Sequence, residues 1–311
     1  MKIIFFGTGK FGLPTLKKLL QSRHDVLAVV TQPDASKGRG WNVFPTSVKA
    51  FIEKAAPDIE VLQPSEVSDP VFIGHIRSID ADVFVVVDYG QILDKQLLEL
   101  PKEYSVNLHP SLLPAYRGAA PVNRAILNGD RETGNTVIKM TEKMDAGAII
   151  AQEKTLIGDE ENAPELIERL AKSGADLLLK TLDLIGSGKA RPISQDEADV
   201  SYAPKLQKKE GKIDWGTPAS DLARKIRAMQ PWPGAFTLID GKVLKIFKTC
   251  VIASGEEEGT PGTVIDENEF VVKAGRDALR IDVLQIEGKR KMPRDEFLRG
   301  QKVTKGKVLG V

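Results

Sequence analysis

The chain has 311 residues, of which 41% are hydrophobic and 28% are charged, and this composition is typical of a globular protein. Its length predicts two domains. Because no apolar run reaches the ~18 residues of a transmembrane helix and the first one is too short for a signal peptide, we expect a cytoplasmic protein without membrane contact. One cysteine, Cys250, excludes an internal disulfide, and three histidines offer no Cys/His zinc spacing, so no metal is expected.

The net charge of +1 conceals an asymmetry between the two halves of the chain. Residues 205–311 hold 21 Lys and Arg against 15 Asp and Glu, a balance of +6, which leaves 23 against 28, or −5, for residues 1–204. A basic second half indicates a polyanionic partner, although a solvated charged surface explains the count equally well.

Apolar runs alternate with helical patterns over residues 1–188. Expected strands are 2–6, 26–31, 59–62, 83–87 and 106–108, with helices at 13–20, 47–56 and 71–76 between them. This alternation predicts an α/β fold with a doubly wound, mostly parallel sheet, whose ligands bind at the carboxyl ends of the strands. Two further strands, 136–141 and 148–156, and a helix at 163–185 are expected to complete this part.

The rest of the chain has a different pattern. Residues 189–203 are polar and contain Arg191-Pro192, which indicates a linker. A helix is expected at 219–229, followed by short strands separated by Gly-containing turns. We predict a small antiparallel barrel or sandwich over residues 204–311, with Cys250 buried as a small apolar residue of one strand.

The stretch GTGKFG at residues 7–12 matches the dinucleotide-binding pattern G-x-G-x-x-G. The complete motif needs an acidic residue at the end of the second strand, where this chain has Thr31, with Asp34 beyond a Gln-Pro turn. The alternative is that the three glycines allow a strand and a helix to pack closely.

The segment from Asn107 to Pro121 carries the strongest chemical signal. Asn107 and His109 share one face of a strand end, because side chains alternate along a strand. An amide that donates to an oxyanion and an imidazole that exchanges a proton suit acyl transfer. Asp145, in a turn between two later strands, could orient the imidazole.

Each of these residues also has a purely structural interpretation. His109 could be a hydrogen-bonded core residue, and Asn107 and Asp145 could cap turns. Ser111 could be a nucleophile, but it lacks the G-x-S-x-G context.

The pattern Asn-x-His-x-Ser-Leu-Leu-Pro-x-x-Arg-Gly, with an Asp-x-Gly downstream, resembles the folate-dependent formyltransferases. The resemblance implies transfer of a formyl group from 10-formyltetrahydrofolate to an amine, with tetrahydrofolate released. It also implies that Asn107 binds the formyl oxygen, His109 stabilises the intermediate, and Asp145 orients His109. The residues implied around the folate are Ser111, Leu112, Leu113, Pro114, Asp88, Tyr89, Gly90 and Ile92.

The similarity is greatest to the branch of the family that acts on initiator methionyl-tRNA. It covers Gly118-Ala119-Ala120-Pro121, the basic loop at 31–40 and the second-half motifs at 202–206, 212–215 and 230–233. The resemblance implies a monomer with a Rossmann-like catalytic domain (1–188), a linker (189–203) and an OB-like barrel that binds tRNA (204–311). The implied tRNA contacts are Lys37, Arg39, Lys205, Lys208 and Lys209. A transferase acting on a UDP-linked amino sugar is the main alternative, and a dinucleotide-dependent oxidoreductase is the other.

Overall fold

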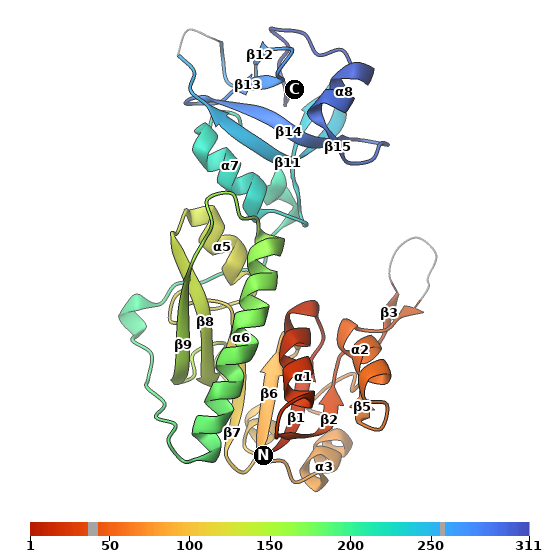
Figure 1. Ribbon diagram of the computed structural model, residues 1–311, viewed down its shortest axis with the longest axis vertical. Helices are drawn as coiled ribbons and strands as arrows, with labels where there is room; N and C mark the ends of the chain where they lie inside the picture. Colours follow the sequence, from red (N-terminus) through yellow and green to blue (C-terminus); the bar gives the residue numbers. More distant parts are fainter. Residues whose placement is uncertain (37–42, 256–258, 311) are drawn as a thin grey trace. The chain divides into compact units, whose positions relative to one another are not determined.

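A seven-stranded sheet organises the first part of the computed structural model, which describes residues 1–36, 43–255 and 259–310 (Figure 1). Its strand order is β5-β2-β1-β6-β7-β8-β9, parallel from β5 to β7 and antiparallel at β8 and β9. The strands are β1 (Lys2–Gly7), β2 (Asp25–Val30), β5 (Glu60–Leu62), β6 (Val83–Val87), β7 (Tyr104–His109), β8 (Glu132–Lys139) and β9 (Ile149–Leu156). The predicted doubly wound, mostly parallel sheet is confirmed.

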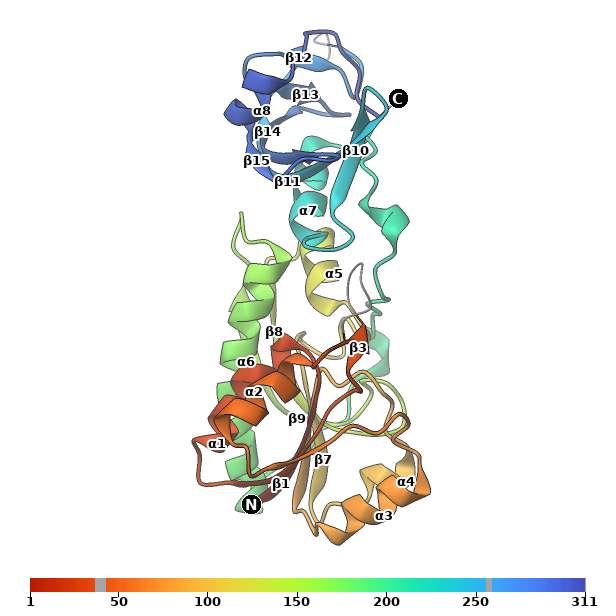
Figure 2. The same ribbon diagram turned by 90° about the vertical axis from the view of Figure 1, so that its right-hand side faces the viewer.

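Helices cover both faces of this sheet (Figure 2). Helices α1 (Leu13–Leu20), α2 (Ser47–Ala55) and α6 (Ala163–Gly186) lie on one face, and α3 (Pro70–Ser78) and α4 (Lys95–Leu98) lie on the other. Strand β6 is buried along its whole length, as its continuous apolar run predicts for a central strand. A short helix, α5 (Pro121–Asn128), and a two-stranded ribbon, β3 (Ala35–Ser36) with β4 (Val43–Phe44), were not expected from the sequence.

The close packing of α6 on β7 and β8 depends on a small residue in the helix. A Cβ atom added to Gly174 would lie 2.9 Å from Leu108 Cδ2 and 3.0 Å from Asn135 Cγ. Asn135 also donates from Nδ2 to the Leu170 carbonyl at 2.9 Å, which ties the helix to the sheet. Helix α6 is therefore packed closely against β7, the strand that carries Asn107 and His109.

The second part of the chain is an antiparallel sheet of order β10-β11-β14-β13-β12, with β15 beside β14. Its elements are α7 (Ala219–Ala228), β10 (Ala235–Ile239), β11 (Lys242–Ile252), β12 (Val264–Asp266), β13 (Val271–Lys273), β14 (Ala278–Ile286), β15 (Met292–Pro293) and α8 (Arg294–Gly300). Trp215, Leu222 and Phe270 contribute to one apolar core with these strands. The predicted small antiparallel β fold is confirmed.

Cys250 contradicts its predicted burial, because its side chain is exposed. Strand β11 alternates regularly up to Ile246, but its pairing with β14 shifts at Ile246/Lys248 and again at Lys248/Thr249. Each irregularity moves the following side chains relative to the two faces of the sheet. Simple alternation therefore assigns Cys250 to the wrong face.

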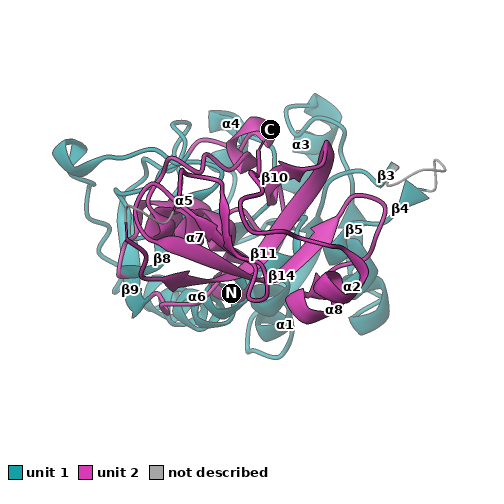
Figure 3. Cartoon of the chain, turned by 90° about the horizontal axis from the view of Figure 1, so that it is seen from above, with its two compact units in different colours: residues 1–121, 132–156, 167–203 teal, residues 122–131, 157–166, 204–311 magenta. Residues whose placement is uncertain are grey.

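The chain separates into two units by its internal contacts (Figure 3). The first contains residues 1–121, 132–156 and 167–203, and the second contains 122–131, 157–166 and 204–311. The second unit thus includes two segments from within the range 1–188. The segment expected as a linker belongs to the first unit up to residue 203, and Ile193 in this segment pairs with Ile149 of β9.

Candidate active site

Asn107 and His109 occupy the carboxyl end of β7, between β6 and β8. They lie two residues apart on one strand, so they share the face that the alternation of side chains predicts. His109 is buried, whereas Asn107 is half-buried. Within the described part of the chain, no group forms a hydrogen bond with the side-chain carboxamide of Asn107. Its two N–H donors are therefore available to a substrate.

The His109 ring faces a different group at each of its nitrogens. Its Nε2 lies 2.9 Å from the carbonyl oxygen of Tyr116, and its Nδ1 lies 3.6 Å from Oδ1 of Asp145. A carbonyl oxygen can only accept, so Nε2 carries a proton and donates it. Nδ1 is consequently the ring atom that can take up a proton, and the Asp145 carboxylate is placed to stabilise the resulting imidazolium.

Asp145 lies in the turn between β8 and β9 with a φ of 52°. Its Oδ2 accepts a hydrogen bond of 2.8 Å from the Gly118 N–H. Gly118 has a φ of 126°, and a Cβ there would lie 2.7 Å from the Ala203 carbonyl oxygen, so a side chain is strongly disfavoured at this position. The structure brings Asp145 to His109, as expected for an orienting carboxylate.

The loop after His109 is fixed by hydrogen bonds to β8 and β9. Ser111 donates from Oγ to the Ala115 carbonyl at 2.7 Å, so its hydroxyl serves the loop. Thr136 Oγ1 donates to the Ser111 carbonyl at 2.6 Å and accepts from the Leu113 N–H at 3.1 Å. Gln152 adds a bond of 2.9 Å to the Leu113 carbonyl.

The exposure of this loop decides which groups could contact a folate. Ser111 and Leu113 are buried at 1% and 3% exposure, while Leu112 and Pro114 are half-buried. Side-chain contact with a ligand is therefore open to Leu112 and Pro114, whereas Ser111 and Leu113 shape the loop from inside.

The segment after β6 forms a second loop at the same edge of the sheet. Asp88 and Gly90 have positive φ values of 52° and 95°, and Ile92 is 71% exposed. Tyr89 points into the core, where its ring and the ring of Phe6 form an edge-to-face pair with centroids 5.5 Å apart. Burial raises the pKa of its hydroxyl. Tyr89 is thus a packing residue, while the exposed Ile92 side chain is open to contact with a ligand.

The three glycines of residues 7–12 are explained by packing. A Cβ on Gly7 would lie 2.5 Å from the Phe5 ring, and one on Gly12 would lie 3.1 Å from the Val87 carbonyl oxygen. A Cβ on Gly9 would overlap the carboxylate of Asp88. The Asp34 carboxylate, which lies just beyond the end of the second strand, is bound by Lys49 and Gln63. The structure gives no support to a dinucleotide cradle.

The residues expected to contact tRNA fall into two groups. Lys37 and Arg39 lie outside the described residues. Lys205, Lys208 and Lys209 are exposed at the start of the second unit, where Lys208–Gly211 forms a short 3-10 helix.

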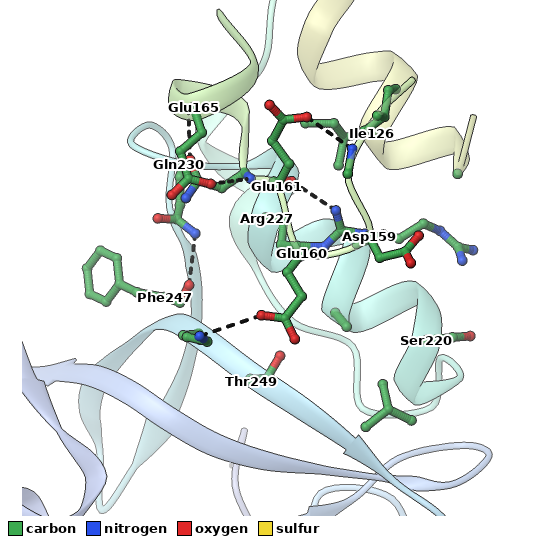
Figure 4. Close-up of a pocket in the computed structure, with 18 of the residues that line it drawn as sticks. Ile126, Asp159, Glu160, Glu161, Glu165, Ser220, Arg227, Gln230, Phe247 and Thr249 are labelled. Atoms are coloured by element: carbon green, nitrogen blue, oxygen red, sulfur yellow. Dashed lines mark hydrogen bonds and ion pairs between the residues drawn. The ribbon is translucent and has the colours of Figure 1, made fainter. Parts of the chain in front are cut away.

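A cavity of about 900 Å³ lies within the second unit and contains none of the candidate catalytic residues (Figure 4). Several of its charged and polar lining residues are paired with one another. Arg227 donates to the Glu161 carbonyl at 2.9 Å, Lys248 lies 3.6 Å from Glu160, and Gln230 donates to the Phe247 carbonyl at 2.8 Å. These contacts join the 157–166 segment to α7 and β11.

Two further properties concern residues 1–36, 43–255 and 259–310. No cluster of three or more potential metal-ligating side chains is found there. No helix among these residues is long and apolar enough to cross a bilayer.

Two protein-family profiles match the chain. One, described as formyl transferase, matches residues 1–182, and the other, described as formyl transferase, C-terminal domain, matches residues 205–302. Together the two matches leave only residues 183–204 and 303–311 outside a formyl transferase profile. The geometry at Asn107, His109 and Asp145 falls within the first match.

Curated relatives define the branch of the family. The methionyl-tRNA formyltransferase of Geotalea uraniireducens is 44% identical over 319 residues, covering 100% of this chain and 98% of the relative. That of Caldanaerobacter subterraneus subsp. tengcongensis is 42% identical, covering 99% of this chain and 100% of the relative. The chain therefore belongs to the methionyl-tRNA formyltransferase family, whose members are transferases.

Solved structures share the fold at lower identity. WlaRD, described as a sugar 3N-formyl transferase, has a TM-score of 0.67 and 20% identity over 93% of this chain and 99% of its own. HypX from Aquifex aeolicus, in complex with tetrahydrofolic acid, has a TM-score of 0.66 and 18% identity, and this chain spans 50% of its length. At these identities the likeness supports the fold alone.

Proposed function

We propose that this enzyme transfers the formyl group of 10-formyltetrahydrofolate to the α-amino group of initiator methionyl-tRNA, in the cytoplasm and as a monomer, for translation initiation. The observation that carries the proposal is the meeting of Asn107, His109 and Asp145 at the carboxyl end of β7. It stands in a chain similar to methionyl-tRNA formyltransferases along its whole length.

Asn107 stabilises the oxyanion in the proposed mechanism. The amine nitrogen attacks the formyl carbon as the neutral base, a C–N bond forms, and the carbonyl electron pair moves to oxygen. The free N–H donors of Asn107 fit that oxygen, and donors fixed before the reaction stabilise its charge most effectively. Collapse of the intermediate then breaks the bond from the formyl carbon to N10 of the folate.

His109 and Asp145 move the proton that this reaction requires. The attacking amine loses one proton, and N10 of the leaving tetrahydrofolate gains one, so the overall step is balanced. His109 Nδ1 can hold the proton between these events, because the Asp145 carboxylate at 3.6 Å stabilises the imidazolium. The Tyr116 carbonyl holds the ring orientation throughout.

The two loops at the edge of the sheet provide the proposed donor site. The exposed Ile92 offers an apolar contact to the pterin, and main-chain groups at Gly90 would offer hydrogen bonds to its polar edge. Leu112 and Pro114 would contact the folate from the opposite loop. Release of tetrahydrofolate completes the turnover.

Basic side chains provide the proposed contacts with tRNA. Lys205, Lys208 and Lys209 are exposed and suit phosphate oxygens, which position a nucleic acid without reading its sequence. Lys37 and Arg39 are proposed to reach the acceptor end.

An acceptor assay tests this function. The purified enzyme is mixed with 10-formyltetrahydrofolate and either initiator methionyl-tRNA or a UDP-linked amino sugar, and formylated products are quantified. We expect N-formylmethionyl-tRNA alone. Formylation of the sugar alone would leave the site chemistry in place and overturn the proposed acceptor, and NADH binding in a fluorescence titration would instead favour an oxidoreductase.

A further inference from the structure

The segment 193–203 forms part of the candidate site instead of only joining two units. Ile193 of this segment pairs with Ile149. In addition, the carbonyl oxygen of Ser201 accepts a hydrogen bond of 2.9 Å from the Arg117 N–H. Ala203 donates its N–H to the Arg117 carbonyl at 2.8 Å. The main chain of this segment therefore runs beside residues 116–118, which provide the partners of both His109 and Asp145.

Gln195 is the residue of this segment that reaches the catalytic turn. Its Nε2 donates to the carbonyl oxygens of Asp145 and Gly147, both at 2.7 Å. Its Oε1 accepts from Nε and Nη2 of Arg117, at 3.0 and 2.8 Å. All four bonds expected of a carboxamide are thus used, so the side chain has a single defined orientation.

Arg117 is an unusually fixed partner for Gln195. Its side chain is only 4% exposed, and its guanidinium also pairs with Glu197 at 3.0 Å. The paired Arg117 holds the pKa of the Glu197 carboxyl below its usual range. A buried cation that bonds the oxygen of Gln195 also polarises the amide and strengthens its two donor bonds.

The turn that Gln195 binds needs external support. Asp145 has a φ of 52°, in the left-handed region that few residues other than glycine, asparagine and aspartate adopt. That conformation directs its carboxylate to the Gly118 N–H and toward His109. Bonds from Gln195 on both sides of residue 146 oppose relaxation of the turn.

We infer that Gln195, oriented by Arg117, is a positioning residue that holds the Asp145 turn in the geometry needed to stabilise the His109 imidazolium. The inference rests on the catalytic roles proposed above for His109 and Asp145. Gln195 does not contact the reacting atoms; it acts through the main chain of residues 145 and 147.

Two substitutions separate the parts of this interaction. Gln195→Met keeps the length of the side chain and removes both donors and the acceptor. Gln195→Glu keeps an acceptor for Arg117 but presents oxygens to the carbonyls of Asp145 and Gly147. We expect both variants to lower kcat by about 10–100-fold, as a small misplacement of a catalytic group does. The KM for the folate and the KM for tRNA should each stay within threefold of the parent.

Glu197→Gln is the matched control. It changes an exposed partner of Arg117 that does not contact the turn, and we expect kcat within twofold of the parent. If Gln195→Glu retained parental kcat, the Arg117 contact alone would matter, and the proposed support of Asp145 would be overturned. Thermal unfolding of each variant identifies a loss of kcat that arises from unfolding.

A spectroscopic measurement tests the geometry without turnover. The chain has three histidines, so the ¹⁵N–¹H imidazole spectrum is simple to assign by single replacements. We expect Gln195→Met to shift or broaden the His109 signals while those of His24 and His75 stay unchanged. Unchanged His109 signals together with parental kcat would overturn the inference. Absence of formylation by the parent enzyme would instead refute the proposed function, and the His109 signals would still decide the inference.

Discussion

Among the described residues, none bonds the side-chain amide of Asn107, which lies beside a buried histidine, and this arrangement predicts a specific kinetic defect. Asn107→Ala should lower kcat by about 10²–10³-fold, because one preorganised oxyanion donor is lost, while both KM values change little. Asn107→Asp has nearly the same shape but replaces the donor with an acceptor, so it should be at least equally impaired. Steady-state kinetics check this, and an Ala variant within tenfold of the parent would exclude the oxyanion role.

The carboxyl of Asp88 should make the free energy of unfolding depend on pH. Burial raises the pKa of its carboxyl to about 6. A carboxyl with a higher pKa in the folded state binds its proton more tightly there, so ionisation destabilises the fold above about pH 6, and this penalty is lost below about pH 4. Asp88→Asn should therefore stabilise the protein at pH 7.5 more than at pH 4.5.

The size of this effect is limited because Asp88 as a whole residue is exposed to solvent, which screens the carboxyl. We expect a gain below about 1.5 kcal/mol at pH 7.5, measured by urea unfolding. Asn also tolerates the positive φ of 52° at this position, but that contribution does not vary with pH. An equal gain at both pH values would show that the carboxyl is not perturbed.

At the scale of elements, the turn from β1 into the following helix depends on the contact of Gly9 with Asp88. Gly9→Ala should lower the free energy of unfolding by about 1 kcal/mol, because its methyl group overlaps the carboxylate and forces that exposed side chain to turn away. In an Asp88→Gly background most of this loss should disappear. A double-mutant cycle by denaturant unfolding measures the coupling, and additive effects would refute the contact as the cause.

The sequence predicts the elements that repeat a simple pattern and misses those that depend on tertiary contacts. The continuous apolar run of β6 and the strand end at Asn107 and His109 could be predicted because local periodicity determines them. The exposure of Cys250 could not be predicted, because two register shifts change which side chains of β11 point to each face of the sheet.

The same limit applies to the candidate site. Its side chains carry recognisable chemistry, but three of their partners are main-chain groups at residues 116, 118 and 145, which any residue possesses. Gln195 lies in a polar segment that composition assigns to a linker, and only its contacts across 50 residues indicate another role. Sequence patterns contain no signal for such partners.

At the scale of the whole molecule, the basic balance of +6 over residues 205–311 predicts salt-dependent binding of tRNA. Each phosphate contact releases counterions, so the KM for tRNA should rise steeply with salt while the KM for the folate stays nearly constant. Replacing Lys205, Lys208 and Lys209 by Ala should reduce the logarithmic salt slope by about one per lost contact. A slope unaffected by all three replacements would exclude these lysines from the interface.

If the site around His109 formylates methionyl-tRNA, a single-turnover measurement should isolate that chemical step. Enzyme in excess over initiator methionyl-tRNA, with saturating 10-formyltetrahydrofolate, gives the rate constant for N-formylmethionyl-tRNA formation in the parent and in His109→Asn. We predict rapid product formation by the parent and a rate constant about 10²–10⁴-fold lower for the folded variant. A rate constant for His109→Asn within tenfold of the parent would contradict the proposed role of His109 in formyl transfer.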